Sequence, residues 1–434
     1  MKAAILAIGT ELTRGELCDS NSCWLSEQLT DLGVDVLEHV TVDDDDARIG
    51  AALLQLGNHV DLLLVTGGLG PTSDDRTAAA AAAALGVPLR RDADSLVAIE
   101  ARYAAAGRRM PETNRKQADL PDSAVPLPNG EGTAPGFRCG IGQADCFFMP
   151  GVPKEMRHLF KRHVQPVVVQ HVKRCAYQEH LRTFGLPESL VAERLAELEA
   201  GGKLHDPQVT LGYRASFPEI EVKIFARAES EALAQEKVAR ATAVAKERLA
   251  PHVFGGRGDG LPAAVGKVLV AQGLRVATAE SCTGGLVGSL LTEVPGSSGY
   301  YVGSVVAYHN TAKAQLLHVD KAVLDQHGAV SEQVAAAMVK GLFSSFDVQI
   351  GVAITGVAGP SGGTADKPVG TVCFAVGLRD QEPVTLRRHF PWGRNGVRTY
   401  SAQFALMLLW HMAQGTLEPD VWAQQFAAPP KGGH

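Results

Sequence analysis

The pattern of apolar residues divides the first part of the chain into short buried strands and amphipathic helices. Residues 2–8 form an apolar run typical of a strand, and residues 21–32 repeat leucines at helical spacing. Two further predicted strands, at 34–42 and 60–65, flank a second amphipathic helix. This alternation predicts a parallel sheet with helices on both faces. Ligands of such sheets bind at the carboxyl ends of the strands, where two glycine-containing turns are expected.

A second alternation of strands and helices begins after a glycine-rich stretch at residues 255–260. Between the two alternations, residues 179–254 predict a small α+β segment with a long helix at 230–249. Beyond the glycines, apolar runs predict strands at 275–279, 302–308, 348–354, 369–377 and 384–390. Helical spacing predicts helices at 261–273, 310–317, 331–346 and 394–410. The expected fold class is therefore α/β, with an α+β connector between two sheet domains.

Composition and charge narrow the class of protein. The 434 residues exceed what one hydrophobic core supports, so two or three domains are expected. The net charge of -6 offers no basic surplus for phosphate backbones, and no nucleic-acid partner is expected. No apolar run reaches the ~18 to 20 residues of a membrane span, and the N-terminus lacks an export signal. We therefore expect a cytoplasmic protein whose seven scattered cysteines are reduced thiols.

The strand at 275–279 opens onto a turn that combines possible nucleophiles with two glycines: Glu280, Ser281, Cys282, Thr283, Gly284 and Gly285. Backbone N–H groups at the start of the following helix would make either a phosphate cradle or an oxyanion hole. Ser281, Cys282 and Thr283 are the candidate nucleophiles. A helix capped by Ser281 or Thr283 explains the local pattern equally well. The turn alone leaves both interpretations open.

Tyr308 and Lys313, at the end of one predicted strand and the start of the next helix, supply possible proton-transfer groups. A lysine whose pKa is lowered by burial can act as general base toward a serine, and a tyrosine can relay or orient a proton. The alternative is an ordinary exposed lysine beside a tyrosine at the edge of the core.

A glycine-rich loop and two arginines are candidates for holding an anion. Four glycines, among them Gly356 and Gly359, follow the buried strand at 348–354, which favours a backbone anion site over a flexible hairpin. Arg394 and Arg398 lie one helical turn apart and can clamp a phosphate from one helix face.

The first domain has its own candidate site after the strand at 60–65. A turn rich in glycine contains Gly67, Gly68, Gly70 and Thr72, and two carboxylates follow it, Asp74 and Asp75. Backbone amides of the turn can hold a diphosphate, while either aspartate can bind a hard divalent cation of unspecified identity. A simple cap of the predicted helix at 76–85 accounts for one aspartate but explains the glycines poorly.

Several long motifs in the same order give the chain a resemblance to the CinA family, the competence/damage-inducible proteins. They are Gly9-Thr10-Glu11-Leu12, Gly67-Gly68-Leu69-Gly70-Pro71-Thr72, Asn129-Gly130 with Gly132-Thr133-Ala134-Pro135-Gly136, Met149-Pro150-Gly151-Val152-Pro153, Ala279 to Gly285, and Gly356-Val357-Ala358-Gly359-Pro360. The resemblance implies a doubly wound MoaB/MogA-like domain at 1–172, a KH-like connector at 173–255, an amidohydrolase domain at 256–415 and a tail at 416–434.

The resemblance also implies two activities in pyridine-nucleotide salvage. The C-terminal domain is similar to nicotinamide-nucleotide amidohydrolases, which convert nicotinamide mononucleotide to nicotinate mononucleotide and ammonia without a cofactor. The N-terminal domain is similar to domains associated with metal-dependent hydrolysis of ADP-ribose. The resemblance further implies a homodimer. The connector lacks the Gly-x-x-Gly loop of RNA-binding KH modules, so RNA binding is not expected.

Site roles follow from the resemblance residue by residue. Ser281 is the expected nucleophile, with Thr283 as the alternative, and Tyr308 and Lys313 handle protons. The remaining C-terminal candidates bind substrate: N–H groups near Thr283, Gly284 and Gly285 as oxyanion hole, and Glu280, Gly356, Gly359, Arg394 and Arg398 around the nucleotide. In the N-terminal domain, Asp74 or Asp75 would hold the cation and the glycine turn the diphosphate. Molybdopterin-type binding or adenylyl transfer is the rival there, and a non-catalytic role in competence or DNA damage is the rival for the whole chain.

Overall fold

The computed structural model describes residues 1–172 and 175–423. The chain divides into two compact units, of which the first contains Met1–Gln178 and the second contains most of the chain from Glu179 onward. Within the described residues, no helix combines the length and apolar character that crossing a membrane requires.

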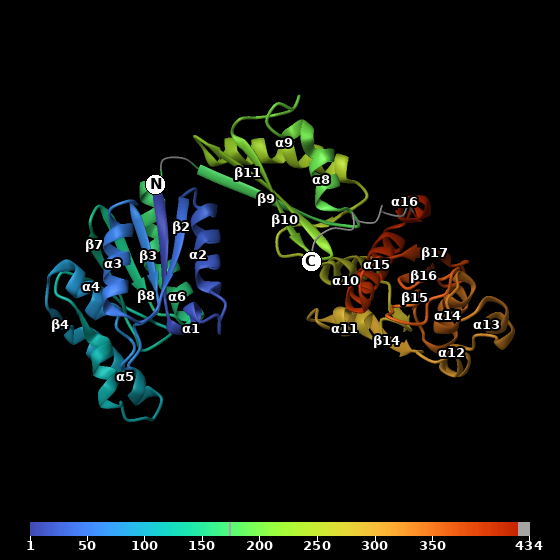
Figure 1. Cartoon of the computed structure of the whole chain (residues 1–434), viewed down its shortest axis with the longest axis horizontal. Coiled ribbons are helices and arrows are strands. Elements are labelled where there is room, and N and C mark those ends of the chain that lie inside the picture. The colour runs from blue at the N-terminus through green and yellow to red at the C-terminus, as the bar shows by residue number, and fades with distance from the viewer. Residues whose placement is uncertain (173–174, 424–434) are drawn as a thin grey trace. The chain divides into compact units, whose positions relative to one another are not determined.

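A six-stranded mixed sheet, with the order β2-β1-β3-β8-β7-β6, forms the centre of the N-terminal domain (Figure 1). Four neighbouring strands run parallel: β1 (Lys2–Ile8), β2 (Asp35–Val42), β3 (Leu62–Thr66) and β8 (Ala144–Met149). The hairpin of β6 (Val125–Leu127) and β7 (Gly136–Ile141) adds two antiparallel strands at one edge. The strands predicted from the sequence, β1, β2 and β3, are parallel as expected. A short turn joins β7 to β8, so this pair is antiparallel and the whole sheet is mixed.

Helices cover both faces of this sheet because successive residues of β1 point to opposite sides. Ala3 and Ile5 pack in one core with residues of α2 (Ser20–Asp31) and α6 (Pro153–Leu159). Ala4 and Leu6 pack in the other core with residues of α3 (Asp46–Gly57) and α4 (Thr77–Leu85). Burial on both faces explains why β1 and β3 read as continuous apolar runs.

The loops that matter for function gather at the carboxyl edge of the parallel strands. The chain leaves β1 into α1 (Thr10–Thr13), β2 into the acidic turn at 43–46, β3 into the glycine turn and β8 into Pro150 and Gly151. Since β7 runs antiparallel to β8, the 128–135 loop that precedes β7 lies at this same edge. Beyond α4 the chain forms β4 (Leu89–Arg91), α5 (Ala93–Ala105), the 3-10 helix η1 (Glu112–Ala118) and β5 (Asp119–Pro121). The domain ends in the π-helix η2 (Phe160–Val164) and α7 (Gln165–His171).

The connector is a small α+β element, as expected. Its four strands, in the order β10-β11-β9-β12, are β9 (Cys175–Phe184), β10 (Val209–Ser216), β11 (Glu219–Ala228) and β12 (Val253–Gly255). Its helices are α8 (Glu188–Leu195), the short η3 (Ala196–Leu198) and the long α9 (Glu231–Leu249).

A five-stranded sheet, ordered β14-β13-β15-β16-β17, organises the C-terminal domain. Strands β13 (Val276–Glu280), β14 (Tyr301–Val306) and β15 (Ile350–Gly356) are parallel, whereas β16 (Thr371–Leu378) and β17 (Val384–His389) are antiparallel. One core contains residues of α10 (Leu261–Gln272), α11 (Leu286–Thr292) and α15 (Arg394–Gln414). The opposite core contains residues of α12 (Asn310–Leu317), α13 (Lys321–His327) and α14 (Glu332–Ser345). The turn after β13 therefore opens at the carboxyl edge, beside the ends of β14 and β15.

The chain after α15 forms one more short helix, which packs onto the C-terminal domain. Within the tail predicted at 416–434, α16 (Pro419–Ala423) is helical, and Trp422 is buried in the core that contains α15. Residues 424–434 of that tail lie outside the described residues.

Candidate active sites

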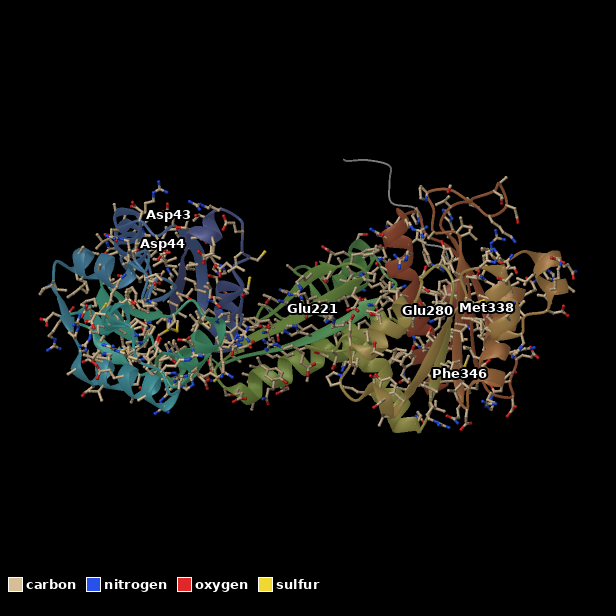
Figure 2. All side chains as sticks on the ribbon, turned by 90° about the horizontal axis from the view of Figure 1, so that it is seen from below. Asp43, Asp44, Glu221, Glu280, Met338 and Phe346 are labelled. Carbon is tan, nitrogen blue, oxygen red and sulfur yellow. The ribbon has the colours of Figure 1, made fainter. Side chains whose placement is uncertain are left out.

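Glu280, the last residue of β13, is fully buried within the C-terminal domain (Figure 2). Its Oε2 accepts hydrogen bonds from the N–H groups of Gly285 and Val287 at 2.9 and 3.1 Å, and its Oε1 accepts one from Gly288 at 2.9 Å. The carboxylate thus satisfies the unpaired N–H groups at the start of α11 and faces the positive end of the helix dipole. Both oxygens of Glu280 accept hydrogen bonds from the protein's own backbone, which favours a structural role over the predicted contact with substrate.

The amides of Gly284 and Gly285, which were expected to contribute to an oxyanion hole, donate within the turn itself. The N–H of Gly285 donates to Glu280, and the N–H of Gly284 donates to the Ser281 carbonyl at 3.1 Å. Both glycines have positive φ, +65° and +94°, so the turn requires them for its conformation. The two glycine amides are therefore internal to the turn and do not face a substrate oxygen.

Ser281 and Lys313 form the central contact of the site. Ser281 is held at the carboxyl edge because its N–H donates to the Ile354 carbonyl of β15 at 3.0 Å. Lys313 reaches it from α12, placing Nζ 3.0 Å from Ser281 Oγ. The same Nζ donates to the Ala307 carbonyl at 2.8 Å and approaches that of Tyr308 at 3.4 Å. Three oxygens thus fix the lysine amine beside the serine hydroxyl.

Burial shifts the pKa of two groups in this site. The Lys313 side chain is almost completely buried, and this desolvation lowers the pKa of its amine, because the charged form loses its water. Burial has the opposite effect on the adjacent thiol and raises the pKa of Cys282 to about 12. A neutral thiol is a poor nucleophile, so the environment favours Ser281 over Cys282.

A pocket of about 150 Å³ opens onto this pair. Five residues predicted from the sequence line it: Ser281, Tyr308, Lys313, Gly356 and Arg394. Its remaining walls come from residues that the sequence analysis missed or gave no role in binding: Cys282, Ala329, Val330, Thr355 and Ala358. The Thr355 hydroxyl donates to the Ala329 carbonyl at 2.7 Å and so anchors the wall before α14. Thr355 could have been found as the strand residue directly before Gly356, whereas the apolar wall has no distinguishing pattern.

Tyr308 and Arg394 lie on the outer side of this pocket. Arg394 donates through Nη1 to the Gly359 carbonyl at 2.7 Å and through Nη2 to the Tyr308 hydroxyl at 3.4 Å. Tyr308 is 63% exposed, and its backbone carbonyl, not its hydroxyl, is the group that contacts Lys313. The structure therefore separates the predicted proton-handling pair: Lys313 touches Ser281 while the Tyr308 ring faces outward.

Three other predicted residues do not line the pocket but contribute to the structure around it. Arg398 donates to the Thr283 carbonyl at 3.0 Å and so holds the turn at residues 280–285 in place. Gly359 has a φ of +84°, and a Cβ there would lie 2.4 Å from Val369 Cγ1. Thr283 is fully buried, and its hydroxyl has no hydrogen-bond partner among the described residues. A hydroxyl enclosed in this way cannot reach substrate, so the geometry favours Ser281 as nucleophile.

In the N-terminal domain, the glycines of the turn after β3 are required by packing. A Cβ at Gly67 would lie 2.0 Å from the Ile8 carbonyl oxygen, and one at Gly68 would lie 2.2 Å from Thr77 Oγ1. Gly70 is needed because a Cβ there would meet the Asp75 carboxylate at 2.5 Å. Close packing against β1 and α4 thus explains glycines that, from the sequence, only a diphosphate site explained well.

The two aspartates after this turn differ in availability. Asp75 accepts a hydrogen bond from the N–H of Thr72 at 2.8 Å and another from the Thr72 hydroxyl. These two bonds fix the conformation of the loop. Asp74 is exposed, and its interactions with the Thr72 side chain, with its own N–H and with Lys116 lower the pKa of its carboxyl. Among the described residues, no group of three or more His, Cys, Asp or Glu side chains could hold a metal ion. Asp74 therefore offers a single carboxylate, and Mg²⁺ commonly binds through only one or two protein carboxylates together with water and substrate phosphates.

Two further residues that the site predictions did not include arrange this edge. Asn21 donates through Nδ2 to the Gly151 carbonyl at 2.7 Å and to Thr66 Oγ1 at 3.2 Å, joining the loops after β3 and β8. Lys116 of η1 donates to the Thr72 carbonyl at 2.5 Å. Asn21 lies within a polar helix start, and nothing in the hydrophobic pattern distinguishes it.

Three family models match successive parts of the chain. A probable molybdopterin binding domain matches residues 4–170, a damage-inducible protein CinA KH domain matches 178–255, and a CinA C-terminal domain matches 259–413. These matches, together with the two sheets and the α+β connector, define a protein that joins a molybdopterin-binding-type α/β domain to a CinA C-terminal domain through a KH module.

The chain belongs to the CinA family. It is 40% identical over 430 residues to a protein of Symbiobacterium thermophilum named as competence-damage inducible, covering 96% of this chain and all of the relative. It is also 40% identical to a CinA-like protein of Frankia casuarinae over 437 residues, covering 99% and 100% of the two chains. The crystal structure of a CinA protein of unknown function from Thermoplasma acidophilum shares 35% identity and covers 38% of this chain and 97% of its own, with a TM-score of 0.36.

The role of Glu280 can be tested by removing its carboxylate. We expect Glu280→Ala to destabilise the C-terminal domain by about 3 kcal/mol or more, because three buried N–H groups lose their acceptor. Denaturant unfolding of the full chain measures this loss. Glu293→Ala, on an exposed glutamate that follows α11, is the matched control and should stay within about 0.5 kcal/mol. An unchanged unfolding midpoint in Glu280→Ala would contradict the structural role.

Proposed function

We propose that the C-terminal domain hydrolyses the carboxamide of nicotinamide mononucleotide to nicotinate mononucleotide and ammonia. The observation that carries the proposal is the buried Lys313 amine 3.0 Å from Ser281 Oγ, at the mouth of a small pocket. A lysine with a lowered pKa beside a serine is a recognised means of activating the hydroxyl as a nucleophile. The choice of substrate rests on the resemblance of this domain to nicotinamide-nucleotide amidohydrolases.

The proposed reaction uses Lys313 as both base and acid. The neutral amine takes the proton of Ser281 as Oγ attacks the carbonyl carbon of the carboxamide, forming a tetrahedral oxyanion. The lysine ammonium then gives this proton to the departing nitrogen, and ammonia leaves an ester on Ser281. Water, deprotonated by Lys313, attacks the ester, and the acid is released as the serine regains its proton. The carbonyls of Ala307 and Tyr308 keep the amine directed at Ser281 throughout.

The dimensions of the pocket agree with a substrate that only partly enters. Its volume of about 150 Å³ is below the ~300–1,000 Å³ of pockets that enclose a drug-sized ligand. The ring that bears the amide would occupy the pocket, between the apolar wall of Ala329 and Val330 and the serine. The phosphate would remain outside, near the positive charge of the exposed Arg394 guanidinium.

The nucleophile is tested by Ser281→Ala. We expect ammonia release from nicotinamide mononucleotide to be abolished while calorimetric binding of the substrate changes little, because the alanine removes only the attacking oxygen. Thr283→Val is the matched control and should retain turnover, since the Thr283 hydroxyl is buried and has no partner among the described residues. Turnover retained in Ser281→Ala would rule out this nucleophile. No ammonia from the unaltered protein would reject the amidase and favour a non-catalytic role.

The lowered pKa of Lys313 predicts how activity and stability depend on pH. Activity should rise with pH through this pKa, because only the neutral amine accepts the serine proton. A lysine whose pKa is lower in the folded state than in the unfolded state destabilises the fold when it is protonated. This loss of stability is complete at a pH below the folded-state pKa, and it disappears at a pH above the unfolded-state pKa. Lys313→Met should therefore lose activity. As pH falls, the variant should become more stable relative to the unaltered protein, because methionine carries no buried charge. Denaturant unfolding from about pH 10 down to about pH 6 measures the shift.

The exposed Lys321 provides the control for this pH dependence. Lys321→Met should show no comparable trend, because its ion pair with Asp325 lies on the surface. A constant difference between Lys313→Met and the unaltered protein across the pH range would show that the buried amine does not titrate as proposed.

For the N-terminal domain we propose hydrolysis of the diphosphate of ADP-ribose to AMP and ribose 5-phosphate. The support is the position of the glycine turn at the carboxyl edge, the exposed Asp74 beside it, and the family resemblance. A divalent cation, when bound by Asp74 and the substrate, would neutralise charge on the phosphates. Thr72 and Lys116 would keep the loop and the Asp74 carboxylate in position.

Incubation of the full chain with ADP-ribose and Mg²⁺ tests this second activity. AMP release, followed by chromatography, should disappear with a chelator and fall at least about tenfold in Asp74→Asn, because the cation loses its charged protein ligand. Ammonia release by the C-terminal domain should be unaffected. Asp61→Asn, at the opposite end of β3, is the control and should leave AMP release unchanged. Absence of AMP together with pyrophosphate release from ATP would instead indicate adenylyl transfer.

A further inference from the structure

Phe217 brings the connector into contact with the C-terminal domain. It lies in the turn between β10 and β11, and both this turn and the C-terminal domain belong to the second compact unit. The centroid of the Phe217 ring lies 5.2 Å from that of Trp392, with an interplanar angle of 78°, and 6.0 Å from that of Tyr400. Edge-to-face aromatic pairs at about 4.5–7 Å attract each other beyond the burial of their apolar area. The turn therefore packs on the segment directly before α15.

Trp392 is held from its other sides by the core of the C-terminal domain. Its ring stacks on that of Phe390, at 5.8 Å and 17°, and its centroid lies 4.7 Å from that of Tyr400. Both of these partners are buried. A Cβ at Gly396 would lie 2.7 Å from Trp392 Cβ, so the tryptophan lies directly against the first turn of α15. Phe217 thus covers a ring that the core holds but buries only in part.

The first turn of α15 has no capping side chain to hold it. Its N-cap residue is Gly393, which offers no side-chain acceptor to the first N–H groups of the helix. The first helical residue is Arg394, and the helix dipole disfavours a positive charge at this end. The position of the turn therefore depends on packing, and Trp392, directly before Gly393, supplies it.

This turn carries a cation of the active-site pocket. Arg394 lines the pocket together with Ser281, and its Nη1 donates to the Gly359 carbonyl at 2.7 Å. The residue is exposed, and an arginine side chain loses much rotamer freedom when it is held in one place. A displacement of about 1 Å at a substrate-binding group can cost up to about 100-fold in rate. A change in the packing of Trp392 would therefore reach the guanidinium that faces the substrate.

We propose that Phe217 is a positioning residue for the phosphate of the substrate. Its ring covers Trp392, Trp392 fixes the first turn of α15, and that turn places the Arg394 guanidinium at the pocket. The inference rests on the proposed amidase function, and it gives the connector a part in substrate binding by the C-terminal domain. The chemistry at Ser281 and Lys313 does not involve this contact.

Removal of the ring tests the proposal. We expect Phe217→Ala to raise the KM for nicotinamide mononucleotide at least about fivefold while kcat changes less than about twofold, because only binding of the phosphate is weakened. Phe217→Tyr keeps the ring and should keep the KM. Leu204→Ala is the matched control, since Leu204 is an apolar residue of the connector with a similar exposed fraction, 49% against 56%. A purely structural contact would instead lower the thermal unfolding midpoint and leave the KM unchanged, which would overturn the proposal.

A double-mutant cycle tests whether Phe217 acts through Arg394. Arg394→Ala should raise the KM by itself, and Phe217→Ala added to it should raise the KM by less than about a further twofold, because the group that Phe217 positions is already gone. Independent effects that multiply in the double variant would overturn the proposed route. An equal rise of the KM in Leu204→Ala would overturn the assignment to Phe217.

Calorimetric binding of nicotinamide mononucleotide to the full chain separates this inference from the proposed activity. If the unaltered protein binds the nucleotide but releases no ammonia, the amidase is rejected, and a Kd that rises in Phe217→Ala but not in Phe217→Tyr still supports the positioning role. If ammonia is released with the same KM in Phe217→Ala as in the unaltered protein, the amidase is supported and the positioning role is overturned. Failure of the nucleotide to bind the unaltered protein would overturn both.

Discussion

The carboxylate of Glu280, buried at the start of α11, is the interaction on which the C-terminal site depends. A buried charge without partners would be very costly, but here three backbone N–H groups and the helix dipole compensate it. The same contacts join the end of β13 to the first turn of α11, with Ser281 as the next residue between them. Ser281, the proposed nucleophile, therefore directly follows a carboxylate that backbone amides hold in place.

Lys313 completes this arrangement from the opposite core. Its helix, α12, packs with α14 on the face of the sheet away from α11, and its amine crosses the carboxyl edge to reach Ser281. Desolvation lowers the pKa of the amine, which prepares it to accept a proton at a cost to the stability of the fold. In the proposed reaction, the Glu280 carboxylate positions the turn that holds Ser281, and the Lys313 amine transfers the proton.

The N-terminal domain also has helices on both faces of a sheet, but its candidate site brings together fewer of the predicted residues. Its glycine turn is packed tightly against β1 and α4. Asp75 accepts hydrogen bonds from Thr72 within the loop, whereas Asp74 is the exposed carboxylate there. An open pocket lies further along the edge, where Asn129 and Arg102 hold the 128–135 loop to α5.

Local sequence was sufficient for the elements, the domain order and the family, because strand and helix periodicity, glycine turns and ordered motifs are properties of neighbouring residues. It also indicated Ser281, Lys313 and Gly356, since each lies at a strand end or helix start that the pattern marks. The partners of these residues depended on contacts between distant segments. Only the tertiary structure showed that Glu280 binds amides instead of substrate, that the hydroxyl of Tyr308 faces Arg394, and that Thr283 is enclosed. Burial and hydrogen-bond partners decide the role of a polar side chain, and both are set by packing across the fold.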